Sequence, residues 1–197
     1  MKFSGREKYL LFLCVVLLLF NALLLHQNRM LKDVKSPSST VPAIVRKSIK
    51  HILQREHHIY TLQGQEVVFE KILNSRYVAL IFFSEYDCPM CLEERRYWNK
   101  LTIFDSVSVF GIVRAEQPSE ELKLWLENLG LAFPVYYDKR GHVTDLMLKE
   151  FSLEATPIKL LITDNGEALT VQGPETDYYR QEGWFLHVVE ELLRRKL

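Results

Sequence analysis

The chain has 197 residues, of which 48% are hydrophobic, so it has room for one domain with a substantial core and for an additional segment. Its formal net charge is zero, and the composition therefore gives no reason to expect a nucleic acid or an acidic surface as a partner. Only three cysteines are present, too few for a secreted scaffold held by several disulfides, so the core must hold the fold.

The N-terminal segment is predicted to be a membrane anchor. Residues 9–25 are apolar except for Asn21, and as a helix rising about 1.5 Å per residue they nearly cross a hydrocarbon layer of about 30 Å. A cleaved signal peptide is the alternative, but Leu23-Leu24-Leu25-His26 offers no small-x-small cleavage site. The third cysteine, Cys14, lies within this run and is interpreted as a small apolar residue.

Basic residues flank the predicted anchor almost equally on its two sides, so charge alone does not set its orientation. These residues are Lys2, Arg6 and Lys8 before the span, and Arg29, Lys32 and Lys35 after it. We expect residues 1–8 to form a cytoplasmic head, because a short basic head before a single span is the usual signal-anchor arrangement. Residues 26–42 would be a flexible tether, and residues 43–197 a domain on the outer side of the cytoplasmic membrane.

At the start of the domain, apolar residues recur at helical spacing over residues 44–53, with basic residues between them. This pattern predicts a short amphipathic helix that packs at the domain's edge, although its basic face leaves a membrane-surface helix open. His57 and His58 are adjacent and cannot both face one site on a regular element, so we interpret them as surface residues. Residues 59–69 then predict a β-hairpin with Gly64 in the turn.

Strands and helices alternate over the rest of the chain. The predicted elements are a buried strand at 78–84, a helix at 92–104, a buried strand at 107–113, a helix at 118–129 ended by Gly130, a short strand at 133–137, a short helix at 143–151, a hairpin at 158–171 and a helix at 184–193. In the hairpin, Asn165-Gly166 is the favoured pair where both turn residues need positive φ. The alternation predicts an α/β fold with a mixed sheet and helices on both faces.

The motif Cys88-Pro89-Met90-Cys91 lies between the first buried strand and the helix that follows it. A helix N-terminus presents unpaired N–H groups and a partial positive charge, and both favour a thiolate on Cys88. Helical spacing brings the sulfur of Cys91 close enough for a small disulfide ring. Asp87, immediately before the motif, should act in the opposite direction and raise the pKa of the Cys88 thiol. The motif therefore predicts a redox-active dithiol.

The order of elements around this motif resembles the thioredoxin fold, and more closely the membrane-anchored TlpA/ResA-type thiol-disulfide oxidoreductases of the AhpC/TSA-redoxin superfamily. The resemblance covers roughly residues 59–197. It is carried by the motif Cys88-Pro89-Met90-Cys91, by Glu94 three residues later, and by Ala155-Thr156-Pro157 before the hairpin. The N-terminal hairpin and anchor also fit. The chain departs from the family pattern in having no tryptophan shortly before the first cysteine, and no proline soon after Glu94.

The resemblance implies a role for each of five residues. Cys88 would be the exposed nucleophile, Cys91 the resolving cysteine and Glu94 its proton acceptor, while Thr156 and a cis Pro157 would bind the substrate backbone. No cofactor and no metal ion are implied. The implied partners are a thiol- or disulfide-bearing protein substrate, in this family often an apocytochrome c awaiting maturation, and a membrane electron carrier as reductant.

Three other functions were weighed against this one. A redox-inert adaptor with a thioredoxin fold is favoured by Asp87 and by the missing tryptophan. A thiol peroxidase is disfavoured because Glu85, and not threonine, stands three residues before Cys88. A zinc site is disfavoured because the chain has no second CxxC motif and no Cys/His pair at ligand spacing.

Overall fold

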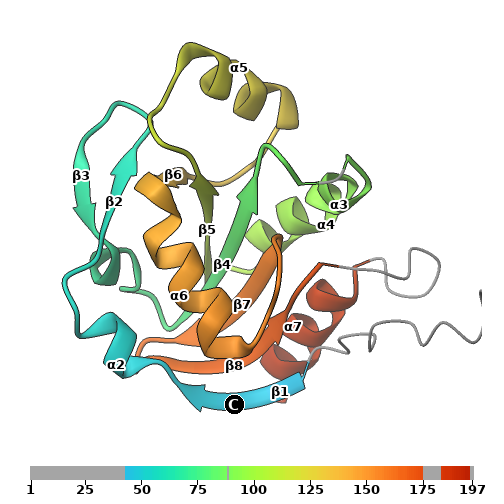
Figure 1. Ribbon diagram of the computed structural model, residues 1–197. Coiled ribbons are helices and arrows are strands. Elements are labelled where there is room, and N and C mark those ends of the chain that lie inside the picture. The colour runs from blue at the N-terminus through green and yellow to red at the C-terminus, as the bar shows by residue number, and fades with distance from the viewer. Residues whose placement is uncertain (1–42, 88, 175–182, 196–197) are drawn as a thin grey trace, which may run out of the picture. The chain divides into compact units, whose positions relative to one another are not determined.

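The computed structural model describes residues 43–87, 89–174 and 183–195 (Figure 1). The predicted head, anchor and tether, residues 1–42, lie outside the described residues, and so does Cys88. In the part of the chain that the structure describes, none of the helices combines the length and apolar character needed to span a membrane.

Eight strands of the described residues form one sheet, in the order β1-β8-β7-β4-β5-β6-β2-β3 (Figure 1). Their bounds are β1 Ala43–Ser48, β2 His58–Thr61, β3 Glu66–Val68, β4 Tyr77–Ser84, β5 Val107–Arg114, β6 Val135–Asp138, β7 Ile158–Thr163 and β8 Glu167–Gln172. Strand β4 is parallel to β5 and antiparallel to β7, and β5 is parallel to β6. The predicted mixed sheet is confirmed, as is the N-terminal hairpin, which consists of β2 and β3.

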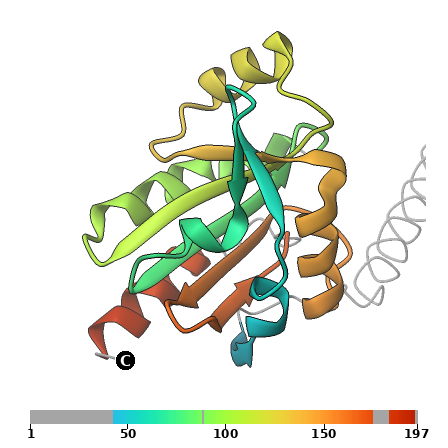
Figure 2. The ribbon, with the colours of Figure 1, turned by 90° about the vertical axis from the view of Figure 1, so that its left-hand side faces the viewer.

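Helices cover both faces of this sheet, as predicted (Figure 2). The α-helices are α2 Lys50–Leu53, α3 Pro89–Glu93, α4 Arg95–Lys100, α5 Glu120–Leu129, α6 His142–Phe151 and α7 Trp184–Arg194. The short 3-10 helices are η1 Phe69–Ile72, η2 Leu101–Ile103 and η3 Lys139–Gly141. Helices α2 and α6 lie on one face, and α4 and α7 on the other. The helix predicted at 92–104 is interrupted at Glu94, which separates α3 from α4.

The core has two parts because side chains of a strand alternate between the two faces. Every residue of β4 is buried, as expected for a strand covered on both sides. Ile81 and Phe83 pack on the α4 and α7 face, where Trp98 is buried. Leu80 and Phe82 pack on the α2 and α6 face. This layered core holds the carboxyl end of β4, where the CxxC motif begins.

The helix predicted over residues 44–53 is wrong for most of its length. Residues Ala43–Ser48 form strand β1, which pairs antiparallel with β8, and only Lys50–Leu53 are helical. An isolated helix of this length is marginal in water, whereas pairing with β8 satisfies many of the same backbone groups, although the ladder is interrupted by a register shift between Ile44 and Lys47. The apolar spacing did not distinguish these outcomes.

Two local predictions are corrected as well. His57 is 7% exposed and therefore buried, not on the surface, and burial lowers its pKa; His58 is exposed as predicted. In the β7–β8 turn only Gly166 has positive φ, at 77°, and Asn165 does not. The Gly166 N–H donates to the Thr163 carbonyl at 2.9 Å, and the ladder register shifts beside the turn, so this is a longer loop with a glycine bulge.

Candidate active site

The CxxC motif lies where β4 ends and α3 begins. Strand β4 ends at Ser84, and α3 starts at Pro89 and contains Cys91. The predicted strand-to-helix position of the motif is confirmed for Pro89 to Cys91, while Cys88 lies outside the described residues. The residues that approach this junction from other elements define the candidate site.

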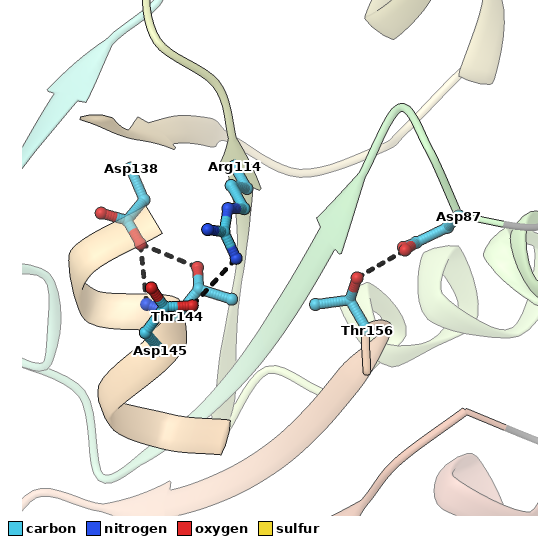
Figure 3. Close-up of polar contacts among 6 residues, drawn as sticks. All are labelled: Asp87, Arg114, Asp138, Thr144, Asp145 and Thr156. Carbon is cyan, nitrogen blue, oxygen red and sulfur yellow. Dashed lines mark hydrogen bonds and ion pairs between the residues drawn. The ribbon is translucent and has the colours of Figure 1, made fainter. Parts of the chain in front are cut away.

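Asp87 connects the loop before Cys88 to the start of β7 (Figure 3). Its Oδ2 accepts a hydrogen bond from the Ser84 N–H at 2.9 Å, and its Oδ1 accepts one from the Thr156 hydroxyl at 2.5 Å. Burial raises the pKa of Asp87, and the two hydrogen bonds partly oppose that shift. The peptide bond between Thr156 and Pro157 is cis, as the family resemblance implied. Because the Thr156 hydroxyl donates to Asp87, its hydrogen points toward that carboxylate.

Glu94 is buried and forms an ion pair that the sequence analysis did not anticipate. Lys159 Nζ donates to Glu94 Oε2 at 2.6 Å. Glu94 is 7% exposed and Lys159 is 0% exposed, so water does not screen the two charges. In the sheet, Lys159 lies opposite Ile81 of β4, on the α4 and α7 face. The signal was available in the sequence, because Lys159 is the only charge in the apolar strand Ile158–Thr163.

This pair links the CxxC segment to the cis-proline segment. Glu94 lies three residues after Cys91, and Lys159 lies two residues after Pro157. Removing one partner of a buried ion pair leaves an uncompensated charge in a medium of low dielectric, which is strongly destabilising. The pair therefore fixes the α3–α4 junction against β7, directly beside the cis proline.

A cleft of about 390 Å³ lies beside the same loop, at the edge where β4, β5 and β6 end. Its lining includes Ser84, Tyr86, Arg114, Arg140, Gln117 and Ser119. Tyr86 is 87% exposed, which is unusual for a large aromatic side chain. In open α/β sheets, ligands commonly bind outside the carboxyl ends of the strands, which is where this cleft lies.

Arg114 is held in place at this cleft. Its Nη1 donates to Asp145 Oδ1 at 2.9 Å (Figure 3), and a Cβ placed on Gly141 would lie 2.5 Å from its Nε. Gly141 also has positive φ, at 71°, so both its conformation and the closely packed guanidinium require glycine. The arginine is therefore already oriented at the rim of the cleft.

A second buried carboxylate, Asp138, lies on the α6 side of the sheet (Figure 3). Its Oδ2 accepts hydrogen bonds from the Thr144 N–H and the Thr144 hydroxyl, both at 2.7 Å. Its Oδ1 has no hydrogen-bond partner among the described residues. Burial raises the pKa of Asp138, and the contacts with Thr144 oppose the shift. Asp138 thus fastens the first turn of α6 to the end of β6.

We compared the sequence and the structure of the chain with those of known proteins. No protein-family model matches the chain. In sequence it is similar to the thiol-disulfide oxidoreductase ResA of Halalkalibacterium halodurans, with 27% identity over 114 residues, which is 56% of this chain and 60% of ResA. The chain therefore spans less than two thirds of the length of this curated relative.

Solved structures resemble the chain over most of the described domain. A thiol:disulfide interchange protein from Bacteroides sp. gives a TM-score of 0.55 at 16% identity, covering 70% of this chain and 86% of that one. The thioredoxin domain of a thiol-disulfide oxidoreductase from Bacteroides vulgatus gives 0.52 at 19% identity, covering 68% and 91%. A secreted Mycobacterium tuberculosis disulfide oxidoreductase homologous to E. coli DsbE gives 0.50 at 16% identity, covering 67% and 96%.

These likenesses show that the chain has a thioredoxin-like fold, which confirms the predicted fold class for the described domain. The resemblance to TlpA/ResA-type thiol-disulfide oxidoreductases that the sequence indicated is supported by the similarity to ResA.

Proposed function

We propose that this protein is a thiol-disulfide oxidoreductase that exchanges disulfides with protein substrates through Cys88 and Cys91. One observation carries the proposal: the CxxC motif stands at the end of β4, and the loop before it is hydrogen-bonded through Asp87 to Thr156 of the cis-proline segment. Two segments that are far apart in the sequence thus meet at Asp87, immediately before the CxxC motif, in a thioredoxin-like fold. The similarity to ResA supports the same activity.

In the proposed reaction, the Cys88 thiolate attacks one sulfur of a substrate disulfide. A mixed disulfide forms, and the other substrate sulfur leaves as a thiolate. The Cys91 thiolate then attacks the Cys88 sulfur, which releases the second substrate thiolate and leaves a Cys88–Cys91 disulfide. The substrate gains two electrons and the protein loses two. A reductant, proposed to be a membrane electron carrier, restores the dithiol.

Glu94 is proposed to accept the proton that Cys91 must lose before it attacks. Its position three residues after Cys91 supports this role. Its carboxylate is also held in place by the ion pair with Lys159. Pro157 and the backbone of Thr156 are proposed to contact the substrate, because the Thr156 hydroxyl is directed to Asp87.

The cleft beside the loop is the proposed place for the substrate chain that flanks the disulfide. Its lining carries the exposed Tyr86, which offers an aromatic surface, and Arg114, which pairs with Asp145, together with the carboxylates of Glu85 and Glu116. We further propose that residues 9–25 anchor the protein in the cytoplasmic membrane with this domain on the outer side. The apolar character of that segment supports the anchor, and disulfide exchange is most useful in such a compartment.

The test is thiol trapping of the full-length chain, carrying Cys14→Ser, across a glutathione redox series. Two thiols should be lost together and recovered reversibly, and Cys88→Ser or Cys91→Ser should abolish that behaviour. In addition, Cys91→Ser should trap mixed disulfides through Cys88 with a model disulfide-bearing protein.

The redox midpoint would then give the direction of electron flow. A value near that of thioredoxin, about −270 mV, indicates a reductant, and one near about −120 mV an oxidant. Two thiols that remain reduced and unreactive over the whole series would refute the oxidoreductase and leave the redox-inert adaptor as the function of this fold.

A further inference from the structure

A second cavity lies away from the dithiol, between the first elements of the domain and the end of α6. Its volume is about 350 Å³, within the range of small-ligand sites. Strand β1 and helix α2 approach the C-terminal end of α6 here (Figure 1), and contacts of Glu150 with Lys47 and His51 join them. Its lining is Lys47, His51, Ile52, Arg55, His57, Leu146, Lys149 and Glu150.

The charges that line this cavity do not cancel. Lys47, Arg55 and Lys149 are three cations, and Glu150 is the one carboxylate among the lining residues. With both histidines neutral, two positive charges remain in excess. By contrast, the whole chain has a formal net charge of zero. The basic residues that the sequence placed on one face of residues 44–55 are thus partly gathered around a cavity.

Glu150 is already occupied by two of its neighbours. Its Oε1 lies 2.8 Å from Lys47 Nζ, which also donates to the Glu150 carbonyl at 2.6 Å. Its Oε2 lies 3.1 Å from His51 Nε2. The hydrogen bond from Lys47, more than any other contact, lowers the pKa of Glu150, so this carboxylate remains charged and holds Lys47 and His51 in position.

Arg55 and Lys149 are the two cations in excess. Both are exposed, and neither side chain has a hydrogen bond or ion pair with another described residue. Beside them, His57 is buried, and its Nε2 has no hydrogen-bond partner among the described residues. Ile52, which is 4% exposed, contributes an apolar wall. The cavity therefore combines two cationic side chains without a partner among the described residues and an apolar surface.

From this arrangement we infer that the cavity between β1, α2 and α6 binds a doubly charged phosphate group, held by Arg55 and Lys149. A phosphate monoester dianion matches the two positive charges in excess, and the arginine guanidinium can donate two parallel hydrogen bonds to its oxygens. The phosphate can belong to a lipid headgroup or to a soluble molecule, and the chemistry of recognition is the same. This site is independent of the dithiol and of the reaction proposed for it.

The experiment is titration calorimetry on the full-length protein in a zwitterionic detergent at low salt, with two probes. One probe is inorganic phosphate, and the other is dihexanoyl phosphatidic acid below its micellar concentration. Arg55→Gln/Lys149→Gln should weaken binding of the active probe by about tenfold or more, because each lost charge-assisted contact is comparable to one factor of ten. The matched control is Lys71→Gln/Arg194→Gln, which removes the same charge from exposed positions outside the cavity.

The outcomes distinguish a soluble phosphate compound from a lipid headgroup, and they distinguish the phosphate site from the proposed redox function. Binding of inorganic phosphate that is lost only in the cavity variant identifies a soluble phosphate compound, and binding of phosphatidic acid alone identifies a lipid headgroup. Absence of binding by both probes, or equal weakening in both double variants, would overturn the inference. Cys88→Ser/Cys91→Ser should bind as the parent does, so a failure of the proposed redox function would leave this result unchanged.

Discussion

The two faces of the sheet bury carboxylates in different ways. On the α4 and α7 face, Glu94 pairs with the ammonium of Lys159 at 2.6 Å. On the α2 and α6 face, Asp138 has no ion pair with a lysine or arginine of the described residues; it accepts two hydrogen bonds from Thr144, and the Val143 N–H and the His142 ring also act to lower its pKa. Asp138 is 0% exposed and Glu94 is 7% exposed, so the difference lies in the partner and not in the burial.

This difference bears on which form of Asp138 the fold favours, because burial raises the pKa of Asp138. A neighbouring full charge stabilises the anion, whereas burial with only neutral donors favours the protonated acid. Asp87, beside the dithiol, belongs with Asp138 in this respect, because its partners are a backbone N–H and a hydroxyl. The site thus places one charge-paired carboxylate near Cys91 and one held only by dipoles next to Cys88.

The largest effect should come from removing the cation of the pair. Lys159→Met keeps most of the side-chain volume but leaves Glu94 buried without a partner, so the free energy of unfolding at pH 7 should fall by about 3–5 kcal/mol. Urea unfolding followed by tryptophan fluorescence measures this, since Trp98 is buried close to Glu94 in the chain.

A double-variant cycle tests whether the loss is due to the pair. Glu94→Gln/Lys159→Met removes both charges and should recover at least half of the stability that Lys159→Met loses. If Lys159→Met alone lowers the free energy of unfolding by less than about 1 kcal/mol, the ammonium does not balance Glu94 and the contrast between the two faces disappears.

An intermediate effect is expected at Asp87. Thr156→Val removes the hydroxyl that donates to Asp87, so the pKa of Asp87 should rise further, because that hydrogen bond lowers it. The free energy of unfolding should fall by about 1–2 kcal/mol, since the carboxylate is half-buried. Carboxyl ¹³C chemical shifts followed with pH report the pKa directly. Thr156→Ser keeps the hydroxyl and is the matched control, and equal pKa values in the two variants would contradict the link.

The sequence predicted those parts of the molecule whose signals are local. The apolar run at β4, the CxxC motif after it and the helix-ending Gly130 could each be predicted from a few neighbouring residues, whereas the cis Pro157 was implied by the family resemblance. The edge strand β1 could not, because the residues that it pairs with in β8 lie 119 to 128 residues further along the chain, and its apolar spacing also fits a helix. Long-range hydrogen bonding decided between the two.

The same limit applies to the candidate site. Asp87 was seen as a charge that would act on Cys88, and Thr156 as a substrate contact, but nothing in the sequence indicated that they bind each other. Lys159 did carry a signal, as a lone charge in a buried strand. Such a residue requires an opposite charge on the same face of the sheet, and Glu94 would have been the nearest candidate beside the motif.

The smallest effect should come from Asp138, and its pH dependence distinguishes it from Glu94. Asp138→Asn keeps an oxygen that can accept both hydrogen bonds from Thr144 and removes the buried charge, so stability at pH 7 should stay within about 1 kcal/mol of the parent, or rise. Because burial raises the pKa of Asp138 above its unfolded value, its contribution to stability is full below the unfolded pKa, near 3.8, and is lost as the pH rises through the folded pKa. The variant lacks this loss, so its stability relative to the parent should increase between pH 4 and pH 7. Chemical unfolding at a series of pH values measures the difference, and a variant that instead becomes less stable than the parent over that range would mean that the Asp138 anion has a stabilising partner, as Glu94 does.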